Sequence, residues 1–396
     1  MKTLQVMGDS AYGGGTVLLS AWCKYLQQRG CMVDVIATDK KTIEVLSTIP
    51  GINIIDSIYI PRNIKLLRDL AAFINIAKLN LSKRYDVVHT YTATPGFVGR
   101  VAAWMTGAKV ILHHQAAWAF SEATNSITKF LYLIIETVPS LVSTTNICVG
   151  KSVANEAKQI GFIPERKLSV IRNGIDPSPY LQNKAVNNKE YFKSNEDAIV
   201  IGATGRLAPL KDYNTLIYAI KYVLTKKNHL PIKLLICGEG SEHETLKNTV
   251  SYLGLDNNVS FLGFQKDIPL FLSGVDIYVS PTLREGLSIS ILEAMAAGLP
   301  IVVSSIPPNM ELIENGINGL VFPPQDPEAL GEALIRFIES PELAESCGKA
   351  AKKKALEEFT IDRMFDETFQ LYVNLLKTSS GKRKLVLLEL LLKFGK

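Results

Sequence analysis

Short apolar runs alternate with helical segments along the first half of the chain. The run Thr3–Met7 is followed by Thr16–Arg29, whose pattern predicts a helix that ends at Gly30. The other strand-like runs of this half are Val33–Ala37, Asp86–Thr90, Val110–His113 and Ile147–Val149. This alternation is typical of an α/β fold with a parallel sheet.

The same alternation starts again in the second half. The turn-rich segment Ile171–Pro177 and the polar run Gln182–Asp197 separate the two halves, so we place a domain boundary there. The strand-like runs of the second half are Ala198–Thr204, Lys233–Cys237, Val259–Leu262, Ile277–Val279, Ile301–Val303 and Gly319–Val321. Two α/β domains joined by one linker should form a cleft, and ligands of such sheets bind beyond the carboxyl ends of the strands.

Length and cysteine content agree with two domains. A chain of 396 residues, 47% of them hydrophobic, can bury two cores, because single domains usually contain about 100–200 residues. The cysteines lie mostly inside apolar runs and lack paired spacing; they are Cys23, Cys31, Cys148, Cys237 and Cys347. They predict neither a disulfide framework nor a zinc site, and they favour a reducing cytosol.

No apolar run approaches the roughly 20 residues of a membrane span. The nearest, Ile127–Val142, is interrupted by Lys129, Glu136 and Pro139, and we interpret it as a core helix. The start of the chain runs directly into a glycine-rich loop and lacks the apolar core of an ordinary signal peptide.

The formal net charge of +5 is concentrated at the end of the chain. Residues 381–396 carry five lysines and arginines against one glutamate, which makes up four of the five net positive charges. The body of the protein is therefore nearly neutral, and nucleic-acid binding gains no support. The tail mixes these cations with leucines, so it fits either an anionic membrane surface or a helix packed on the body or on a partner.

One stretch, Arg284–Pro300, combines several chemical features. It follows the strand-like run Val275–Ser280 and opens a helix that Gly298 and Pro300 end. Free backbone N–H groups at such a helix start suit a phosphate. The stretch also contains two carboxylates, Glu285 and Glu293, which suit sugar hydroxyls, although two glutamates at this spacing also occur by chance in helices.

This stretch resembles the signature of the retaining nucleotide-sugar glycosyltransferases of family 4, in which two such glutamates precede an Ala-Met-Ala helix and a Gly-x-Pro strand. The resemblance covers most of the chain. It implies the GT-B fold, with two Rossmann-like α/β domains facing each other across a cleft. Residues 1–178 would form the acceptor domain, residues 179–363 the donor domain, and residues 364–380 a helix that crosses back to the first domain, before the basic tail at 381–396.

Two cations follow the first strand of the second domain, Arg206 in Gly-Arg-Leu and Lys211 shortly after it. Cations beside a helix N-terminus would neutralise a diphosphate leaving group, although ordinary loop cations are the alternative. The resemblance implies that both grip the donor diphosphate. It further implies that Glu285 orients the donor sugar and that Glu293 binds the ribose hydroxyls.

Small residues around Gly238 would let a flat base approach the backbone, or would form a tight packing turn. The loop that contains Phe264 resembles the family's base-reading loop. The segment Gly8–Thr16 does not match the dinucleotide fingerprint, and family members carry a donor-contacting glycine loop there. The expected donor-binding residues are Gly14, Gly15, Arg206, Lys211, Gly238, Phe264, Glu285, Gly286, Leu287, Ser288, Ile289 and Glu293.

The segment after Val110–His113 departs from the family. Many relatives have a His-Gly pair where this chain has Ala116 and Ala117. Either His113 or His114 supplies the imidazole, or neither does; we favour His114. The expected catalytic set is then Glu285, His114, Arg206 and Lys211, while Trp118 fits an acceptor platform or a core residue equally well.

The resemblance and these residues together predict a retaining, metal-independent, hexosyl- or N-acetylhexosaminyl-type glycosyltransferase without a cofactor. A UDP-sugar is the favoured donor, and a lipid-linked glycan of bacterial surface polysaccharide biosynthesis is the expected acceptor. We expect a cytoplasmic protein, peripheral on the inner face of the cell membrane through residues 381–396. The alternative is a catalytically inactive nucleotide-sugar-binding protein with a regulatory or scaffold role, which would share every donor motif.

Overall fold

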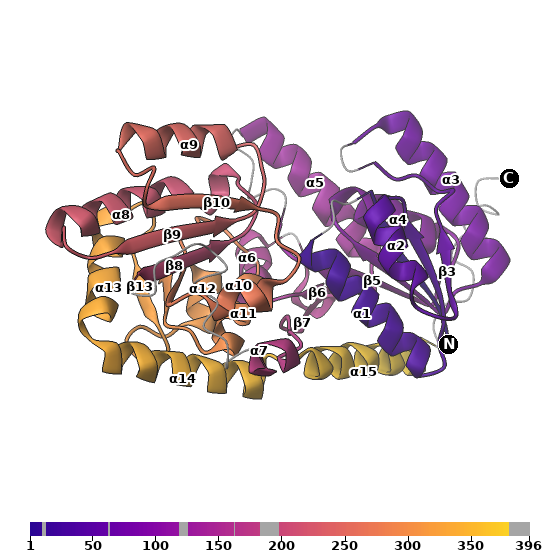
Figure 1. Cartoon of the computed structure of the whole chain (residues 1–396). Helices are drawn as coiled ribbons and strands as arrows, with labels where there is room; N and C mark the ends of the chain where they lie inside the picture. The colour runs from indigo at the N-terminus through magenta and orange to yellow at the C-terminus, as the bar shows by residue number, and fades with distance from the viewer. Residues whose placement is uncertain (10–12, 62–63, 119–125, 162, 183–197, 380–396) are drawn as a thin grey trace, which may run out of the picture. The chain divides into compact units, whose positions relative to one another are not determined.

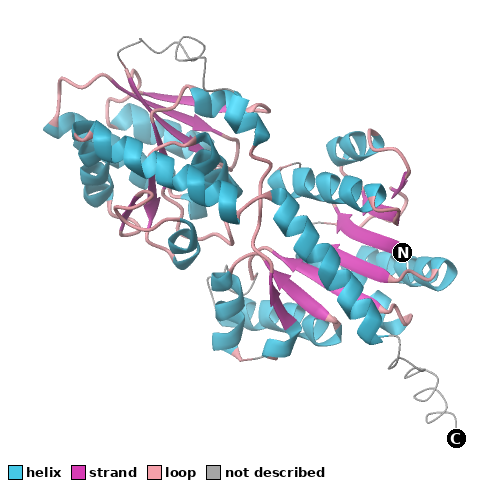
Figure 2. Ribbon diagram, turned by 90° about the horizontal axis from the view of Figure 1, so that it is seen from below, coloured by secondary structure: helices cyan, strands magenta, loops and turns pink. Residues whose placement is uncertain are grey.

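The structure is a computed structural model, in which residues 1–9, 13–61, 64–118, 126–161, 163–182 and 198–379 are described. The chain divides into two compact units, one formed by Met1–Arg172 together with Phe365–Lys396 and the other by Asn173–Met364. Each unit is a parallel β-sheet with helices on both faces (Figures 1 and 2). The basic tail predicted at residues 381–396 lies outside the described residues.

Within its described residues, the first unit has a seven-stranded parallel sheet in the order β3-β2-β1-β4-β5-β6-β7. Its strands are β1 (Lys2–Gly8), β2 (Met32–Ala37), β3 (Ile52–Ile55), β4 (Val87–Tyr91), β5 (Val110–Gln115), β6 (Thr145–Cys148) and β7 (Leu168–Val170). The sequence predicted all of them except β3 and β7. These two are short edge strands in which no residue is buried, although the sequence of β3 is itself apolar.

The helices of this unit are α1 (Gly14–Gln28), α2 (Lys40–Ser47), α3 (Leu66–Lys83), α4 (Ala93–Met105), α5 (Ser126–Val142), α6 (Lys151–Ile160) and α15 (Ile361–Ser379), whose first residues belong to the second unit. α3 packs against α4, and α4 packs against α5. Apolar side chains of α3 and α4, among them Ile76 and Val98, share one core with Leu4, Val88 and Ile111 of the sheet. These three helices therefore form one layer on one face of the sheet.

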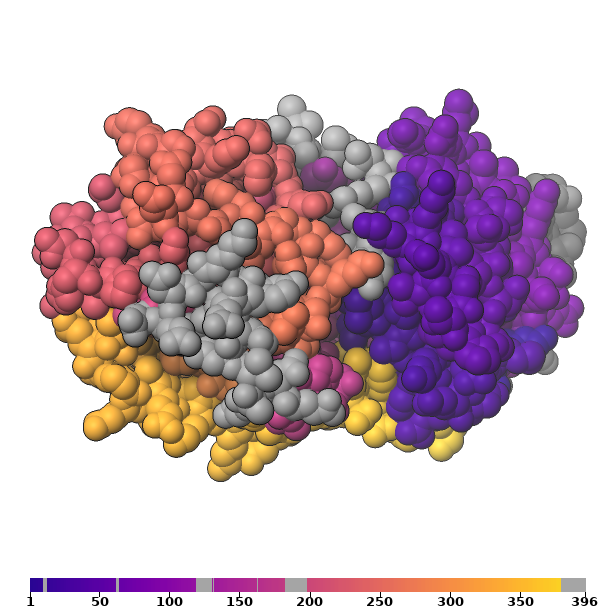
Figure 3. Space-filling model, in the orientation of Figure 1, coloured from indigo at the N-terminus to yellow at the C-terminus, as the bar shows by residue number. Residues whose placement is uncertain are grey.

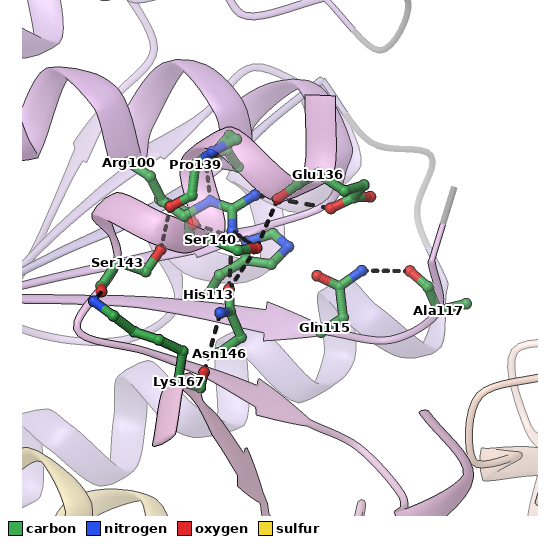
Figure 4. A network of polar contacts seen from close by, with 12 residues as sticks. Arg100, His113, Gln115, Ala117, Glu136, Pro139, Ser140, Ser143, Asn146 and Lys167 are labelled. Carbon is green, nitrogen blue, oxygen red and sulfur yellow. Dashed lines mark hydrogen bonds and ion pairs between the residues drawn. The ribbon is translucent and has the colours of Figure 1, made fainter. Parts of the chain in front are cut away.

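A buried polar network joins α4 to α5 in this layer (Figure 4). Arg100 donates from Nε to the Gly96 carbonyl at 2.6 Å and from Nη1 to Asn146 Oδ1 at 2.9 Å. Its Nη2 lies 3.9 Å from Glu136 Oε2, and both side chains are buried. Burial lowers the pKa of Arg100 to about 10, which still leaves it charged at neutral pH. Glu136 thus interrupts the apolar sequence of α5 because it neutralises a buried cation.

α5 differs from the predicted core helix. Glu136, Pro139 and Ser140 lie on its buried face, whereas the side chains of Phe130, Ile134, Val138 and Leu141 are exposed. The buried face thus holds polar residues of the helix, and an apolar sequence alone does not reveal which face the fold covers. Within the described residues, no helix is both long enough and apolar enough to cross a membrane.

The C-terminal helix α15 is anchored to the first unit through aromatic contacts. Tyr372 is fully buried, and its ring meets Trp22 of α1 edge-on, with 5.5 Å between the ring centroids. The Tyr372 hydroxyl lies 2.6 Å from Nδ1 of the buried His89 in β4. Arg29, the C-terminal cap of α1, forms an ion pair of 2.7 Å with Asp366. These contacts explain why the chain from Phe365 onward belongs to the first unit.

Replacing Tyr372 by phenylalanine is expected to destabilise the first unit by about 1–2 kcal/mol, because His89 loses a buried hydrogen-bond partner. Urea unfolding followed by tryptophan fluorescence measures this, since Trp22 contacts the altered ring. Tyr252→Phe is the control, because Tyr252 is 84% exposed. An unfolding midpoint equal to that of the control variant would contradict the assigned role of the hydroxyl.

The second unit contains, within its described residues, a six-stranded parallel sheet in the order β10-β9-β8-β11-β12-β13. The strands are β8 (Ile199–Thr204), β9 (Ile232–Cys237), β10 (Val259–Gly263), β11 (Ile277–Ser280), β12 (Ile301–Ser304) and β13 (Leu320–Phe322). The sequence predicted each of them. The helices are α7 (Ser178–Gln182), α8 (Tyr213–Lys226), α9 (His243–Tyr252), α10 (Ile268–Ser273), α11 (Ile289–Ala297), α12 (Pro307–Leu312), α13 (Pro327–Glu339) and α14 (Pro341–Glu358).

Residues 173–178, which the sequence placed in the first domain, belong to the second unit. The reason is a pairing between the two chain segments at the boundary. The Ile175 amide donates to the Phe359 carbonyl at 2.9 Å, and the Ile361 amide donates to the Ile175 carbonyl at 2.8 Å. A side chain on Gly174 would collide with the Thr360 carbonyl, so glycine permits this close approach.

Candidate active site

The order of the second sheet reverses beside β8. From β8 the chain continues outward to β9 and β10, and it then returns to β11 on the other side of β8. The loops after β8 and β11 therefore start at neighbouring strand ends and lead to helices on opposite faces, and ligands of open parallel sheets bind at such a point. Arg206 and Lys211 follow β8, and Glu285 follows β11.

Lys211 and Glu285 form a direct ion pair at this point. Lys211 Nζ donates to Glu285 Oε2, and each side chain is 24% exposed. The two loops are fixed to each other by the Leu283 amide and the Thr282 hydroxyl, which both donate to the Leu210 carbonyl, at 2.8 and 2.9 Å. The loops that carry the pair are therefore held together by hydrogen bonds. Both side chains remain partly exposed, so both charges can contact a ligand.

Arg206 lies in the same loop as Lys211 but is differently placed. Its side chain is exposed and makes no ion pair with the residues that the structure describes. The backbone beside it is fixed, because the Leu207 amide donates to the Glu239 carbonyl at 2.9 Å and the Gly205 amide donates to the Cys237 carbonyl at 2.9 Å. The guanidinium is thus an exposed cation on a fixed loop, the same loop that carries Lys211.

The loop after Glu285 leads into the N-terminus of α11. Ser288 caps the helix, with its hydroxyl accepting from the Ile291 amide at 3.4 Å. Gly286, Leu287 and Ser288 are buried, and Ile289 begins the helix. The first amides of a helix lack intrahelical partners and carry the positive end of its dipole, so this segment can hold an anion.

Asn173, which belongs to none of the predicted site motifs, supports this segment. Its side-chain amide donates to the Leu287 carbonyl at 3.1 Å, and Asn173 is buried at the start of the second unit. Its only sequence signal is its place in the turn-rich Arg-Asn-Gly stretch. That signal predicts a turn but no contact with a loop 114 residues away.

Glu293 lies on α11 beyond the anion-binding segment. Tyr180 of α7 donates its hydroxyl to Glu293 Oε1 at 2.9 Å. Burial raises the pKa of Glu293 to about 7, and the hydrogen bond from Tyr180 opposes that rise. The carboxyl group is therefore close to half protonated at neutral pH. Tyr180 also carries no signal in the sequence, because its role depends on a contact across 113 residues.

Gly238 is explained by backbone packing. Its φ is +143°, and a Cβ there would lie 1.8 Å from the Gly205 carbonyl oxygen. The Gly238 amide also donates to the Gly263 carbonyl at 2.8 Å, which holds the loops after β8, β9 and β10 together. The tight packing turn, one of the two interpretations of this glycine, is therefore present in the structure. Phe264, next to Gly263, is exposed on the third of these loops.

Gly14 and Gly15 belong to the first unit and differ from Gly238. They form the first turn of α1 and are exposed. A Cβ at Gly14 would meet no atom within 4 Å, and one at Gly15 would meet only the end of Met7 at 3.7 Å. Packing among the described residues therefore does not require glycine at either position.

The two neighbouring histidines point to opposite faces of the first sheet. His113 is buried against Gly96 of α4 and lies 2.8 Å from the Thr90 hydroxyl. His114 is partly exposed on the other face, with its ring 5.7 Å from that of Tyr91. Burial lowers the pKa of His114 to about 4, so its imidazole is neutral at pH 7. His113 is therefore a structural residue, and of the two only His114 can reach a ligand.

Trp118 is a core residue. It is fully buried, and its indole N–H donates to the Val153 carbonyl at 2.8 Å. This decides between the two interpretations that the sequence left open and excludes an acceptor platform. Within the described residues, no three His, Cys, Asp or Glu side chains come together as metal ligands.

Comparisons with known proteins agree on the class. A family model described as Glycosyltransferase Family 4 matches residues 12–179, and one described as Glycosyl transferases group 1 matches residues 186–354. The chain is 30% identical to the UDP-Gal:alpha-D-GlcNAc-diphosphoundecaprenol alpha-1,3-galactosyltransferase of Escherichia coli, over 79% of this chain and 82% of that protein. It is 23% identical to the capsular polysaccharide biosynthesis glycosyltransferase CapM of Staphylococcus aureus, over 92% of this chain and 96% of that protein.

A solved structure shares the fold over nearly the whole chain. The crystal structure of Anabaena Alr3699/HepE in complex with UDP-glucose matches with a TM-score of 0.80 and 21% identity, and the match covers 94% of this chain and 100% of that one. Together with two domain models and a relative at 30% identity, this confirms the resemblance that the glutamate stretch indicated. The chain belongs to the family 4 glycosyltransferases and has the GT-B fold of two Rossmann-like α/β domains.

Proposed function

We propose that this glycosyltransferase moves a hexosyl or N-acetylhexosaminyl group from a UDP-sugar to a hydroxyl of a lipid-linked glycan, with retention of the anomeric configuration and without a metal ion. The observation that carries the proposal is the Lys211–Glu285 pair beside the N-terminus of α11. The pair and the helix start bring together a cation and backbone amides, which suit a diphosphate, and a carboxylate, which suits a sugar. We also place the reaction on the cytoplasmic face of the cell membrane.

Lys211, Arg206 and the first amides of α11 take the role of the phosphate-binding groups. As the bond between sugar and diphosphate lengthens, negative charge develops on the leaving oxygen, and preorganised cations and amides stabilise it. Lys211 can give up part of its contact with Glu285 to the phosphate, which releases the carboxylate to bind the sugar hydroxyls. Gly286, Leu287, Ser288 and Ile289 provide the backbone of this site.

Retention requires that the leaving group departs and the acceptor attacks on one face of the sugar. The leaving phosphate oxygen then takes the proton of the attacking hydroxyl, so no separate carboxylate base is needed. His114 is neutral at pH 7 and can bind a hydroxyl of the sugar or the acceptor from the first unit. Gly14 and Gly15, which packing does not require, are proposed to contact the donor phosphates.

The choice of donor and acceptor is supported by the relatives. The Escherichia coli relative is named for a UDP-galactose donor and a diphosphoundecaprenol-linked acceptor. The structural neighbour from Anabaena was solved with UDP, and also with UDP-glucose. CapM and the O-antigen enzyme WclY are named for surface polysaccharide biosynthesis. A bacterial capsule, exopolysaccharide or lipopolysaccharide is therefore the proposed product.

The function is tested by incubating the purified protein with labelled UDP-, GDP- and ADP-sugars and a membrane extract. Transfer of label from a UDP-sugar to a lipid fraction is the expected result, and NMR of the product linkage should show the anomeric configuration of the donor. EDTA should leave the rate unchanged, whereas complete loss of activity would contradict metal independence. Binding of UDP-sugars without transfer or hydrolysis would favour the inactive binding protein, which the departure at Ala116 and Ala117 keeps as the second candidate.

Donor binding is expected to weaken as the pH falls below about 7. Burial raises the pKa of Glu293 to about 7, and ribose hydroxyls donate their hydrogen bonds to the ionised carboxylate. Below this pKa the Glu293 carboxyl is protonated and must lose its proton when the donor binds. The cost of this deprotonation raises Kd by up to about tenfold for each pH unit below the pKa. Calorimetry with an intact UDP-sugar measures this, because its esterified diphosphate does not titrate near neutral pH.

Two variants test the assignment to Glu293. Glu293→Gln should remove the pH dependence, while Tyr180→Phe should move its midpoint upward, because the Tyr180 hydroxyl lowers the pKa. The stability of the ligand-free protein should depend on pH in the opposite direction and be greater at low pH. Its raised folded pKa stabilises the fold below the unfolded value of 4.5, and this stabilisation is lost as the pH rises through about 7. Equal pH profiles for the wild type and Glu293→Gln would contradict the ribose-binding role.

A further inference from the structure

The outer surface of the α3–α4–α5 layer carries large apolar side chains that the described structure leaves uncovered. On α3, Leu66 is 81% and Leu67 is 85% exposed, and Leu70, Ile74 and Leu81 are also exposed. The helix is labelled in Figure 1, and its residues belong to the indigo to purple part of the surface in Figure 3. Scattered exposed leucines are ordinary, but several on one helix face mark an interaction site.

These residues form one stripe. At about 100° per residue, Leu67, Leu70, Ile74 and Leu81 project to one side of α3. The buried residues Ala72, Ile76 and Asn80 project to the opposite side, toward the sheet. The stripe therefore faces away from the core of the unit.

α5 carries a second stripe in the same layer. Phe130, Ile134, Val138 and Leu141 repeat at helical spacing and are exposed, opposite the buried side that holds Glu136 and Ser140. Between the two helices, α4 ends with Trp104 and Met105, which are also exposed. Three neighbouring helices thus present apolar side chains on the outside of one layer.

The charged residues of the layer have one sign at its surface. Along α3 and at its ends, the exposed charged residues are Lys65, Arg68, Lys78, Lys83 and Arg84. The sequences of the three helices contain two acids. Asp69 is held by the Lys65 amide at 2.8 Å, and Glu136 is buried beside Arg100. The helix that carries the α3 stripe therefore has cations along it and at both ends, and the described side chains of the three helices include no exposed acid.

We propose that the outer face of α3, together with α5, is a docking surface for an anionic lipid bilayer. An amphipathic helix that joins an apolar face to lysines and arginines lies in the bilayer interface, where apolar burial and attraction to anionic lipid act together. The charge pattern disfavours two other occupants. A second copy would bring the same cations face to face, and the chain's own tail at 381–396 has a net charge of +4. This surface is distinct from the donor site and does not depend on the transfer reaction.

Vesicle sedimentation with the full chain tests the proposal. The wild type should bind vesicles of phosphatidylglycerol and phosphatidylcholine and should not bind phosphatidylcholine alone, and added salt should weaken the binding. The variant Leu67→Gln/Leu70→Gln/Ile74→Gln should bind at least about tenfold less. Its matched control, Tyr252→Gln/Ile317→Gln, removes exposed apolar residues from the second unit and should bind like the wild type. Equal binding by both variants would overturn the proposal.

A site-specific probe keeps the test independent of the triple variant's folding. All five native cysteines are buried, so Leu70→Cys can be labelled selectively with an environment-sensitive fluorophore. Its emission should shift to the blue on addition of phosphatidylglycerol vesicles, while the same label at Tyr252→Cys should not respond. A blue-shifted Leu70→Cys label in vesicle-free buffer would overturn the proposal, because it would mean that the tail or a second copy already covers the stripe.

Discussion

Replacing Lys211 with alanine is expected to lower kcat/KM for the donor by roughly 10²–10³-fold, which corresponds to about 3–4 kcal/mol of transition-state stabilisation. Lys211 is the cation that stands on a fixed loop in direct contact with Glu285. Its removal takes a positive charge from the leaving diphosphate. It also leaves the carboxylate of Glu285 without its counterion, so that this carboxylate repels the phosphates.

The second of these effects makes a double-mutant cycle informative. Glu285→Gln alone should lower kcat by removing the ligand of the donor sugar. In the double variant Lys211→Ala/Glu285→Gln the loss should be smaller than the product of the two single losses, because the unpaired carboxylate is absent. The cycle is measured as steady-state rates of the wild type, the two single variants and the double variant with the preferred UDP-sugar. Additive effects would show that the ion pair does not link the two roles.

Lys353→Ala is the matched control for this experiment, because Lys353 is an exposed lysine on α14 of the same unit, away from the loops of the proposed site. It should retain wild-type kcat and KM. Arg206→Ala should weaken donor binding as well, since its exposed guanidinium is the other cation after β8. Lys211→Ala with a rate within about twofold of the wild type would remove the basis of the proposed mechanism.

Replacing Gly238 with alanine is expected to have the largest effect on stability, at least about 3 kcal/mol. The new Cβ would lie 1.8 Å from the Gly205 carbonyl oxygen, and a φ of +143° is itself unfavourable for alanine. Because the obstructing atom belongs to the backbone, it cannot rotate away. The loops after β8 and β9 must separate, and Arg206 and Lys211 would move with the first of them.

Gly254→Ala separates the two causes of this destabilisation. Gly254 also has a positive φ, of +67°, but a Cβ there would meet no atom within 4 Å. It should cost about 1–2 kcal/mol from the backbone conformation alone. Thermal and urea unfolding of the two variants, together with UDP binding, measure the difference. If Gly238→Ala were no less stable than Gly254→Ala and still bound UDP, the contact with Gly205 would not be what requires glycine at this position.

The sheets were largely predictable because their central strands are buried on both faces. Such strands read as continuous apolar runs, and β1, β2, β4, β5 and β6 were predicted on that basis, as were all strands of the second sheet. β3 and β7 were missed; they are short edge strands and, unlike the other strands, contain no buried residue. The helical segment that became α5 was recognised, but not its exposed face, since the fold buries Glu136 and leaves the large apolar side chains outside.

The candidate site was predictable only in part, because contacts between residues far apart in the sequence leave no local pattern. The residues Arg206, Lys211 and Glu285 follow strands, so the parallel topology suffices to bring them to one edge of a sheet. Their ion pair, by contrast, depends on contacts between two loops. The support from Asn173 and Tyr180 depends on pairs more than 100 residues apart, which no local pattern encodes.

The sequence by itself determined the fold class, the family and the chemical types in the donor site, because strand burial and short motifs are local properties of the chain. Only the tertiary structure decided which groups meet. It joined Lys211 to Glu285, assigned Gly238 to backbone packing and Trp118 to the core, and separated His113 from His114. It also raised the pKa of Glu293, since burial depends on α7 as well as on α11. These outcomes depend on distances between distant segments, and such distances exist only once the chain has folded.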